Sequence, residues 1–258
     1  DEAVKGCDYV LHVASPIGME LPKNEDEMIK PAVEGTLRVL KAASKAGVKR
    51  VVITSSVAAI MYGTDKQGVF NEEDWTDPKN KTTNVYAKSK TLAEQAAWDF
   101  MKHDTSGMEL STVLPAMVFG PILEEDFGVS VGAILDMMNG KYPIVPNWDM
   151  GVVDVRDVAS LELLAMTRPE AAGKRFVCSA ENMFMKDQNE YLSEIFPKSA
   201  SKIPKRVAPN WLIKFLALFL PALKMIAEGL GKERSMDSSR ARNLLGWNPR
   251  SAKEAVKS

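Results

Sequence analysis

Three runs of apolar and β-branched residues limit what this chain can fold into. Each run is continuous rather than alternating, which is typical of a strand inside a parallel sheet with both faces covered. Proline or hydroxylated residues follow each run, as expected where a buried strand ends in a loop. The runs cover residues 9–14, 50–55 and 109–114.

Helical patterns separate these runs. One helix is expected over residues 24–47, either continuous through Pro31 or broken there. A second, amphipathic helix is expected from Tyr86 to about His103. Strands that alternate with helices at these intervals predict an α/β fold built on a doubly wound parallel sheet.

The alternation is less regular after Gly120. We expect a strand at 151–154, a helix that Asp157 caps and that ends at Thr167, and another strand at 175–178. Mostly helical segments are expected after that strand.

Composition argues against several classes of function. The 258-residue chain has a net charge of −1 and 26% charged residues, which suggests no binding to nucleic acid or to an anionic membrane. Cys7 and Cys178 are expected to be free thiols of a reducing compartment, so a cytoplasmic location is expected. Two histidines without a Cys/His cluster indicate no metal site. Charges and Pro221 interrupt the apolar stretch 211–230, which favours buried or pocket-lining helices over a membrane span.

The segments that follow the three strands are candidates for a binding site. In an open parallel sheet, ligands lie beyond the carboxyl ends of the strands. Small, hydroxylated and proline-containing segments stand at these positions and let a ligand approach the backbone. They are Ala14-Ser15-Pro16, Ser55-Ser56 and residues 115–118.

Tyr86 and Lys90 are four residues apart in the second helix, so they lie on one face. A fixed ammonium beside a phenol favours the phenolate and lowers a pKa that starts near ~10, which suits acid–base chemistry at neutral pH. The spacing alone is weak evidence, because Tyr62 and Lys66 repeat it. The Gly-Thr-Asp between that second pair predicts a turn, so only the first pair is expected to share a face.

Six motifs follow one another along the chain. They are His12-Val-Ala-Ser-Pro16, Val51-Val-Ile-Thr-Ser-Ser56, Tyr86-Ala-Lys-Ser-Lys90-Thr-Leu-Ala-Glu94, Leu114-Pro-Ala-Met-Val-Phe-Gly-Pro121, Val153-Asp-Val-Arg-Asp-Val-Ala159 and Leu245-Gly-Trp-Asn-Pro249. In this order they resemble the extended short-chain dehydrogenase/reductases, and most closely the branch of dihydroflavonol 4-reductase and related carbonyl reductases. Each motif alone is weak, but together they cover nearly the whole chain and are specific.

The resemblance implies a catalytic set of Ser56, Tyr86 and Lys90. Tyr86 would give a proton to a carbonyl oxygen while a nicotinamide delivers hydride to the carbon, and Ser56 would polarise the same oxygen. Lys90 would lower the pKa of Tyr86 and hold the ribose of the cofactor. Neighbouring side chains on a strand point to opposite faces, so Ser56 is expected to face the site and Ser55 to cap the strand end.

The resemblance also implies residues that bind the cofactor and the substrate. For each of them, a strand-end turn or plain core packing is the alternative. For Asp154 and Arg156, a structural role and a contact with the substrate are equal alternatives. The cofactor-binding set is Val13, Ala14, Ser15, Thr54, Tyr86, Lys90, Pro115, Ala116 and Val118; the substrate set is Ile17, Met19 and Met61.

Two departures from the family pattern stand out. Ala32 replaces an asparagine that helps to relay protons in many members. The chain also has no glycine-rich pyrophosphate loop, which in the family precedes the strand at Tyr9. The resemblance therefore implies a Rossmann-like fold that is truncated at its N-terminus, with the strand at Tyr9 as an exposed apolar edge and with doubtful activity.

Two parts are expected within this fold. Residues 1–122 would be the C-terminal part of a dinucleotide-binding domain, with sheet contributions from about 151–178. Residues 123–258 would form a small, mostly helical substrate lobe interleaved with it.

The expected function is the NAD(P)H-dependent reduction of a ketone or aldehyde to an alcohol. NADP is the expected cofactor, and NAD stays open. The partner would be a small-molecule carbonyl compound, and a homodimer through the Tyr86 helix is expected from the family. The alternatives are a sugar-nucleotide epimerase or dehydratase of the same fold, and a cofactor-binding protein without catalysis.

Overall fold

The centre of the fold is a parallel sheet of four strands. The computed structural model describes residues 2–17, 22–124, 128–220, 223, 227 and 229–258. The strand order is β1–β2–β4–β7, and all three neighbouring pairs are parallel. This confirms the parallel sheet that the sequence predicted. The strands are β1 (Tyr9–His12), β2 (Arg50–Thr54), β4 (Glu109–Pro115) and β7 (Lys174–Cys178).

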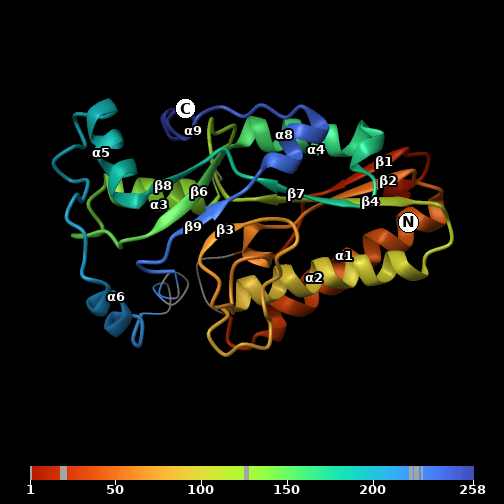
Figure 1. The fold of residues 1–258 in the computed structure, drawn as a ribbon, viewed down its shortest axis with the longest axis horizontal. Coiled ribbons are helices and arrows are strands. Elements are labelled where there is room, and N and C mark those ends of the chain that lie inside the picture. The colour runs from red at the N-terminus through yellow and green to blue at the C-terminus, as the bar shows by residue number, and fades with distance from the viewer. Residues whose placement is uncertain (1, 18–21, 125–127, 221–222, 224–226, 228) are drawn as a thin grey trace.

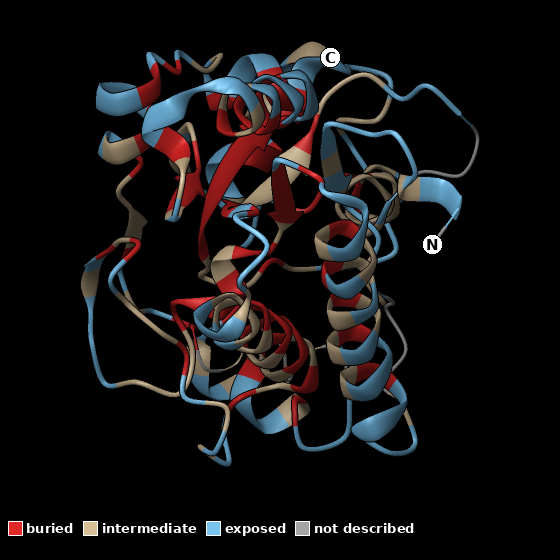
Figure 2. Ribbon diagram, turned by 90° about the vertical axis from the view of Figure 1, so that its right-hand side faces the viewer, coloured by how far each residue is buried: buried red, intermediate tan, exposed pale blue. Residues whose placement is uncertain are grey.

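Helices cover both faces of this sheet (Figure 1). Helices α1 (Asp26–Ala46) and α2 (Val85–His103) lie on one face, and α4 (Val155–Thr167) and α8 (Ser239–Leu245) lie on the other. Figure 2 shows that buried residues gather on the strands between these layers. The doubly wound architecture is therefore confirmed.

Strand β2 shows why its sequence is a continuous apolar run. Val51 and Ile53 pack into a core cluster with Leu40 of α1. Val52 points the other way, into a cluster with Leu161 of α4 and Phe176 of β7. Because both faces are covered by helices, the three central residues of the strand are buried in apolar surroundings whichever way they point.

Strand β1 differs from the sequence prediction of a strand covered on both faces. Tyr9 and Leu11 are 37% and 40% exposed, whereas Val10 packs into the core cluster of α1 and α2. The strand pairs only with β2, so it forms an edge of the sheet among the described residues. The exposed apolar edge that the sequence predicted is observed.

Two smaller sheets lie beside the main one. Strand β6 pairs with β5 in parallel and with β8 in antiparallel fashion, and β3 pairs in parallel with β9. Within the range 151–178, β7 pairs with β4 in the main sheet and β6 pairs with β5 in a smaller one. The division into 1–122 and 123–258 stays a prediction. The strands are β3 (Gly68–Phe70), β5 (Met117–Phe119), β6 (Asp149–Asp154), β8 (Glu181–Phe184) and β9 (Arg234–Met236).

The remaining helices belong mostly to the C-terminal part. Among the described residues, no helix is long and apolar enough to cross a membrane. In α6, Ile213 is buried, whereas Trp211 is 69% exposed, as is Phe219 just beyond the helix. This face is therefore not buried, and the pocket-lining alternative stays a prediction. The helices are α3 (Val129–Met138), α5 (Met185–Ile195), α6 (Asn210–Leu216) and α9 (Ala252–Lys257).

Local signals decide where the long helices begin and end. Helix α1 runs unbroken through Pro31 and ends at Gly47, whose φ of 73° is left-handed. Helix α4 is capped by Asp154, whose Oδ1 accepts a hydrogen bond from the Arg156 amide at 2.8 Å. The prediction of Asp157 as the cap is wrong by one turn.

Asp157 instead joins two of the sequence motifs. Its carboxylate accepts hydrogen bonds from the backbone and side chain of Arg250, at 2.7 and 2.5 Å. Its carbonyl accepts one from Trp247 Nε1 at 2.9 Å, and the Trp247 ring is buried in the core against α4. The motifs at 153–159 and 245–249 therefore fold as one unit, with Asp157 at their contact.

The assignment of the cap predicts a difference between two substitutions. Asp154→Ala should lower the free energy of unfolding by about 1–2 kcal/mol, because an orphan amide of the first turn loses its acceptor. Asp154→Ser should lose less, since serine is also a good N-cap. Urea unfolding of both variants measures the difference, and equal losses would contradict the cap assignment.

Candidate active site

Tyr86 is placed by the first turn of α2. Asn84 caps this helix, and its side-chain oxygen accepts a hydrogen bond from the Ala87 amide at 2.9 Å. The buried phenol of Tyr86 is close enough to the Ser56 hydroxyl for that hydroxyl to act on its pKa. The Ser56 oxygen accepts from the Ala58 amide at 3.1 Å, which leaves its hydrogen available for an oxygen acceptor.

Lys90 follows one turn after Tyr86 and is only 7% exposed. Its Nζ lies 5.9 Å from the centre of the Tyr86 ring and donates to the carbonyl oxygen of Thr54 at 3.4 Å. The structure thus brings together Ser56, Tyr86 and Lys90, the three predicted catalytic residues, at the carboxyl end of β2.

The pKa values of this group reflect burial. Burial lowers the pKa of Lys90 to about 8, although the nearby Glu94 carboxylate acts in the opposite direction. Burial also raises the pKa of Tyr86, and the hydrogen bond from Ser56 opposes that rise only in part. The net pKa of Tyr86 is raised because loss of hydration outweighs the other effects. The lowering effect of Lys90 stays a prediction.

The second tyrosine–lysine pair does not form such a site. Residues 62–66 lie in bends and turns rather than in a helix. Lys66 forms an ion pair with Asp74 at 2.6 Å, outside any shared helical face. The prediction that Tyr62 and Lys66 do not share a helical face is therefore confirmed.

The segment after β1 reaches the same place. Ala14 and Ser15 line a small cavity with Lys90, together with His12, Thr36, Ile53, Thr54, Ser55, Ala93 and Glu94. Val13 is 56% exposed beside it. The Thr54 hydroxyl donates to Glu162 at 2.5 Å, so the predicted cofactor residue Thr54 offers this site its backbone carbonyl.

The segment after β4 leads from the main sheet into the smaller one. Pro115 is buried and pairs with Cys178, and the Ala116 amide donates to the Cys178 carbonyl at 3.0 Å. Val118 is half-buried in β5. These three residues keep their predicted cofactor role as a prediction.

The predicted substrate residues separate. Ile17 is 61% exposed, and Met19 lies outside the described residues. Met61 is 6% exposed and packs against Ile60 and Phe70 in a core cluster. For Met61, core packing is therefore the role that the structure supports.

Sequence reasoning assigned no role to Glu94, which is only 1% exposed. Its carboxylate accepts hydrogen bonds from Ser55 at 2.6 Å, Thr112 at 2.8 Å and Arg175 Nε at 2.7 Å. The available signal was the four-residue spacing from Lys90, which places both on one face of α2. His12 was also missed; burial and the charge of Lys90 lower its pKa.

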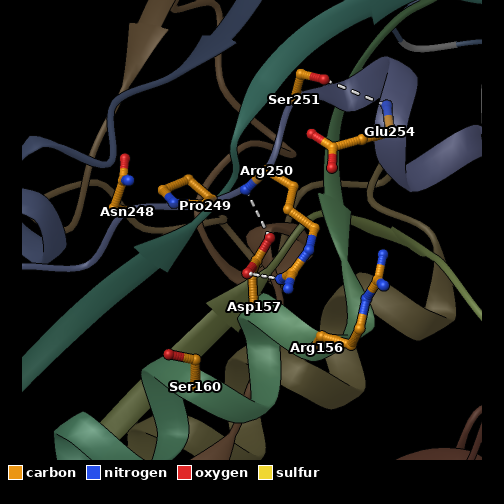
Figure 3. Close-up of a pocket in the computed structure, with 8 residues that line it drawn as sticks. All are labelled: Arg156, Asp157, Ser160, Asn248, Pro249, Arg250, Ser251 and Glu254. Carbon is orange, nitrogen blue, oxygen red and sulfur yellow. Dashed lines mark hydrogen bonds and ion pairs between the residues drawn. The ribbon is translucent and has the colours of Figure 1, made fainter.

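Another cavity lies away from this site. It has a volume of about 590 Å³ and opens between the start of α4 and the C-terminal segment (Figure 3). Its arginines are already paired, Arg250 with Asp157 and Arg156 with Asp154 at 2.6 Å. For Asp154 and Arg156, the structural alternative is the one that these contacts support. The lining residues are Arg156, Asp157, Ser160, Asn248, Pro249, Arg250, Ser251 and Glu254.

Comparison with known proteins agrees with this geometry. The model of the 3-beta hydroxysteroid dehydrogenase/isomerase family matches residues 1–195. The chain belongs to this family. The expected membership in the extended short-chain dehydrogenase/reductases is confirmed, and the dihydroflavonol reductase-like branch fits the relatives found.

Curated relatives include plant reductases. Cinnamoyl-CoA reductase 1 of Petunia hybrida is 38% identical over 201 residues, which cover 76% of this chain and 58% of that protein. An anthocyanidin reductase of Vitis vinifera is 34% identical over 211 residues, covering 76% and 62%. The chain thus spans about three fifths of the length of these relatives.

A solved structure shows the same fold. Yeast methylglyoxal/isovaleraldehyde reductase Gre2, in complex with NADPH, superposes with a TM-score of 0.81 at 29% identity. The match covers 99% of this chain and 76% of that one.

The lowered pKa of Lys90 makes a prediction about stability. Between pH 8 and the ordinary lysine pKa, Lys90 keeps its proton in the unfolded chain but has lost it in the folded chain. The burial of the charged lysine therefore destabilises the fold in full below pH 8, and this cost is relieved as the pH rises above 8. Lys90→Met should raise the free energy of unfolding at pH 7 by up to about 3 kcal/mol. Unfolding at pH 7 and near pH 10 tests this. A gain that does not shrink at the higher pH would contradict it.

Proposed function

We propose that this chain carries the catalytic residues of a reductase that converts a ketone or aldehyde into an alcohol, with NADPH as the cofactor. One observation carries the proposal: at the end of a parallel strand, the Nζ of the buried Lys90, whose pKa is lowered, lies 5.9 Å from the ring of the buried Tyr86, close to Ser56. Groups whose pKa values are strongly shifted by burial concentrate at functional sites.

Each of the three residues has a distinct task. Ser56 donates a hydrogen bond to the substrate carbonyl oxygen, where negative charge develops. Tyr86, kept protonated by its raised pKa, transfers its phenolic proton to that oxygen and completes the hydroxyl group. Lys90 supplies the positive charge that stabilises the resulting tyrosinate, which the burial of Tyr86 alone would disfavour.

The cofactor supplies the hydride that the carbonyl carbon receives. The residues present fit a nicotinamide nucleotide. The Lys90 ammonium has a long, 3.4 Å contact with a backbone carbonyl and can donate to ribose hydroxyls. Ala14 and Ser15 follow β1 and Ala116 follows β4, the two strands on either side of β2, and their small side chains let a ligand approach the backbone. Val13, Pro115 and Val118 would complete the contact.

The relatives support this choice. Yeast Gre2, solved in complex with NADPH, is a methylglyoxal/isovaleraldehyde reductase, and the plant relatives are a cinnamoyl-CoA reductase and an anthocyanidin reductase. We therefore propose a small carbonyl compound with apolar or aromatic groups as the substrate.

Removal of the phenol tests the assignment. In the protein expressed from its complete reading frame, Tyr86→Phe should lower the rate of carbonyl reduction by at least about 100-fold, because the proton donor is lost. NADPH binding, measured by fluorescence titration, should be retained. NADPH oxidation would be followed with a panel of aliphatic and aromatic aldehydes and ketones, and with NADH as the comparison cofactor.

Tyr62→Phe is the matched control, because Tyr62 repeats the spacing to a lysine but lies in a turn. Its rate should equal that of the parent protein. Unchanged turnover in Tyr86→Phe would overturn the catalytic assignment. Turnover of a sugar nucleotide without net NADPH consumption would point instead to an epimerase.

A further inference from the structure

The environment of Glu94 suggests a role that goes beyond packing. This carboxylate is 1% exposed, yet five donor groups surround it. Besides Ser55, Thr112 and Arg175 Nε, it accepts from Arg175 Nη2 at 3.2 Å and from Trp98 Nε1 at 3.3 Å. A buried charge is tolerated when it is paired and its oxygens are satisfied, as here.

Arg175 extends this contact to a surface loop. Its Nη1 donates to the carbonyl oxygens of Glu72 and Asp74 at 2.6 and 2.9 Å. Its guanidinium lies 3.7 Å from the centre of the Trp75 ring. The Glu94–Arg175 ion pair therefore connects α2, β7 and the segment 72–75.

Two of the contacts of Glu94 reach the candidate active site. The bond from Ser55 holds the residue directly before Ser56, at the end of β2. On the same face of α2, the negative charge of Glu94 acts on the Lys90 ammonium one turn away. His12 of β1 and the uncharged Thr36 of α1 also line the small cavity beside Lys90. Among the residues that line this cavity, Glu94 is the only one with a carboxylate.

We propose that Glu94 is a positioning residue, which holds Ser56 opposite Tyr86 through Ser55 and supports the charge of Lys90. The proposal rests on the reductase function proposed above. It assigns to Glu94 no contact with substrate or cofactor. A purely structural role would affect folding but would leave the charge of Lys90 unchanged.

The first test measures Lys90 in the absence of turnover. Glu94→Gln alone would leave Arg175 buried without its partner, so the variant for the test is Glu94→Gln/Arg175→Met, which removes both charges and keeps the volume. The ¹³Cε shift of Lys90, assigned through Lys90→Arg, would be followed against pH. In the parent, the pKa is expected at about 8, and in the double variant it should fall further.

Asp99→Asn is the control for this measurement. Asp99 is a carboxylate on the same helix with a 67% exposed side chain paired to Lys102. Its removal should leave the pKa of Lys90 unchanged, because solvent screens an exposed charge. A folded double variant in which Lys90 titrates as in the parent overturns the electrostatic part of the proposal.

The second test needs no change of charge. Ser55→Ala removes one donor to Glu94 and should lower kcat for carbonyl reduction by about tenfold with little change in KM, because Ser56 is less well placed. Ser44→Ala is the control. Ser44 also donates to a carboxylate at 2.6 Å, that of Asp104 at the far end of α2, and its loss should leave kcat unchanged.

The outcomes of the two tests separate the two proposals. An unchanged kcat in Ser55→Ala overturns the proposal that Glu94 positions Ser56. This test remains valid even if the double variant does not fold. If Tyr86→Phe keeps full activity while the pKa of Lys90 still falls in the double variant, the reductase assignment fails and the electrostatic role of Glu94 stands.

Discussion

The buried ion pair between Glu94 and Arg175 joins more of this structure than any other contact near the candidate site. Through Glu94, helix α2 is bonded to Ser55 after β2, to Thr112 of β4 and to Arg175 of β7. A buried pair of this kind is costly to break on one side only, because the remaining charge has no hydration. The relative placement of helix and sheet is thereby fixed where Ser56, Tyr86 and Lys90 meet.

The parallel sheet explains why the functional groups gather at one edge. Strands β1, β2 and β4 all end in the same direction, so the segments that follow them lie together although the sequence separates them by tens of residues. The helices that cover both faces exclude water from this edge. The same exclusion of water lowers the pKa of Lys90 and raises that of Tyr86. Burial, rather than the proximity of tyrosine and lysine alone, sets the chemistry of the pair.

The wrong prediction of the α4 cap has a physical cause. Asp154 and Asp157 both stand near the start of a helix, and each is a good capping residue. Asp154 caps, because Asp157 is engaged by Arg250 and Trp247 from a segment about ninety residues further along the chain. A distant segment therefore decided between two local possibilities. The short strands β3, β5, β8 and β9 were missed because three or four residues carry too little periodicity.

The sequence by itself determined the alternation of strands and helices and the shared helical face of Tyr86 and Lys90. It also showed that Tyr62 and Lys66 do not share such a face. These features depend on residues that are within a few positions of one another, so spacing and turn-forming residues suffice to specify them. Only the tertiary structure decided the direction of each pKa shift, the partner of Asp157 and the contacts of Glu94. Glu94 bonds to residues 39 and 81 positions away, and such contacts exist only once the sheet and both helix layers have assembled around them.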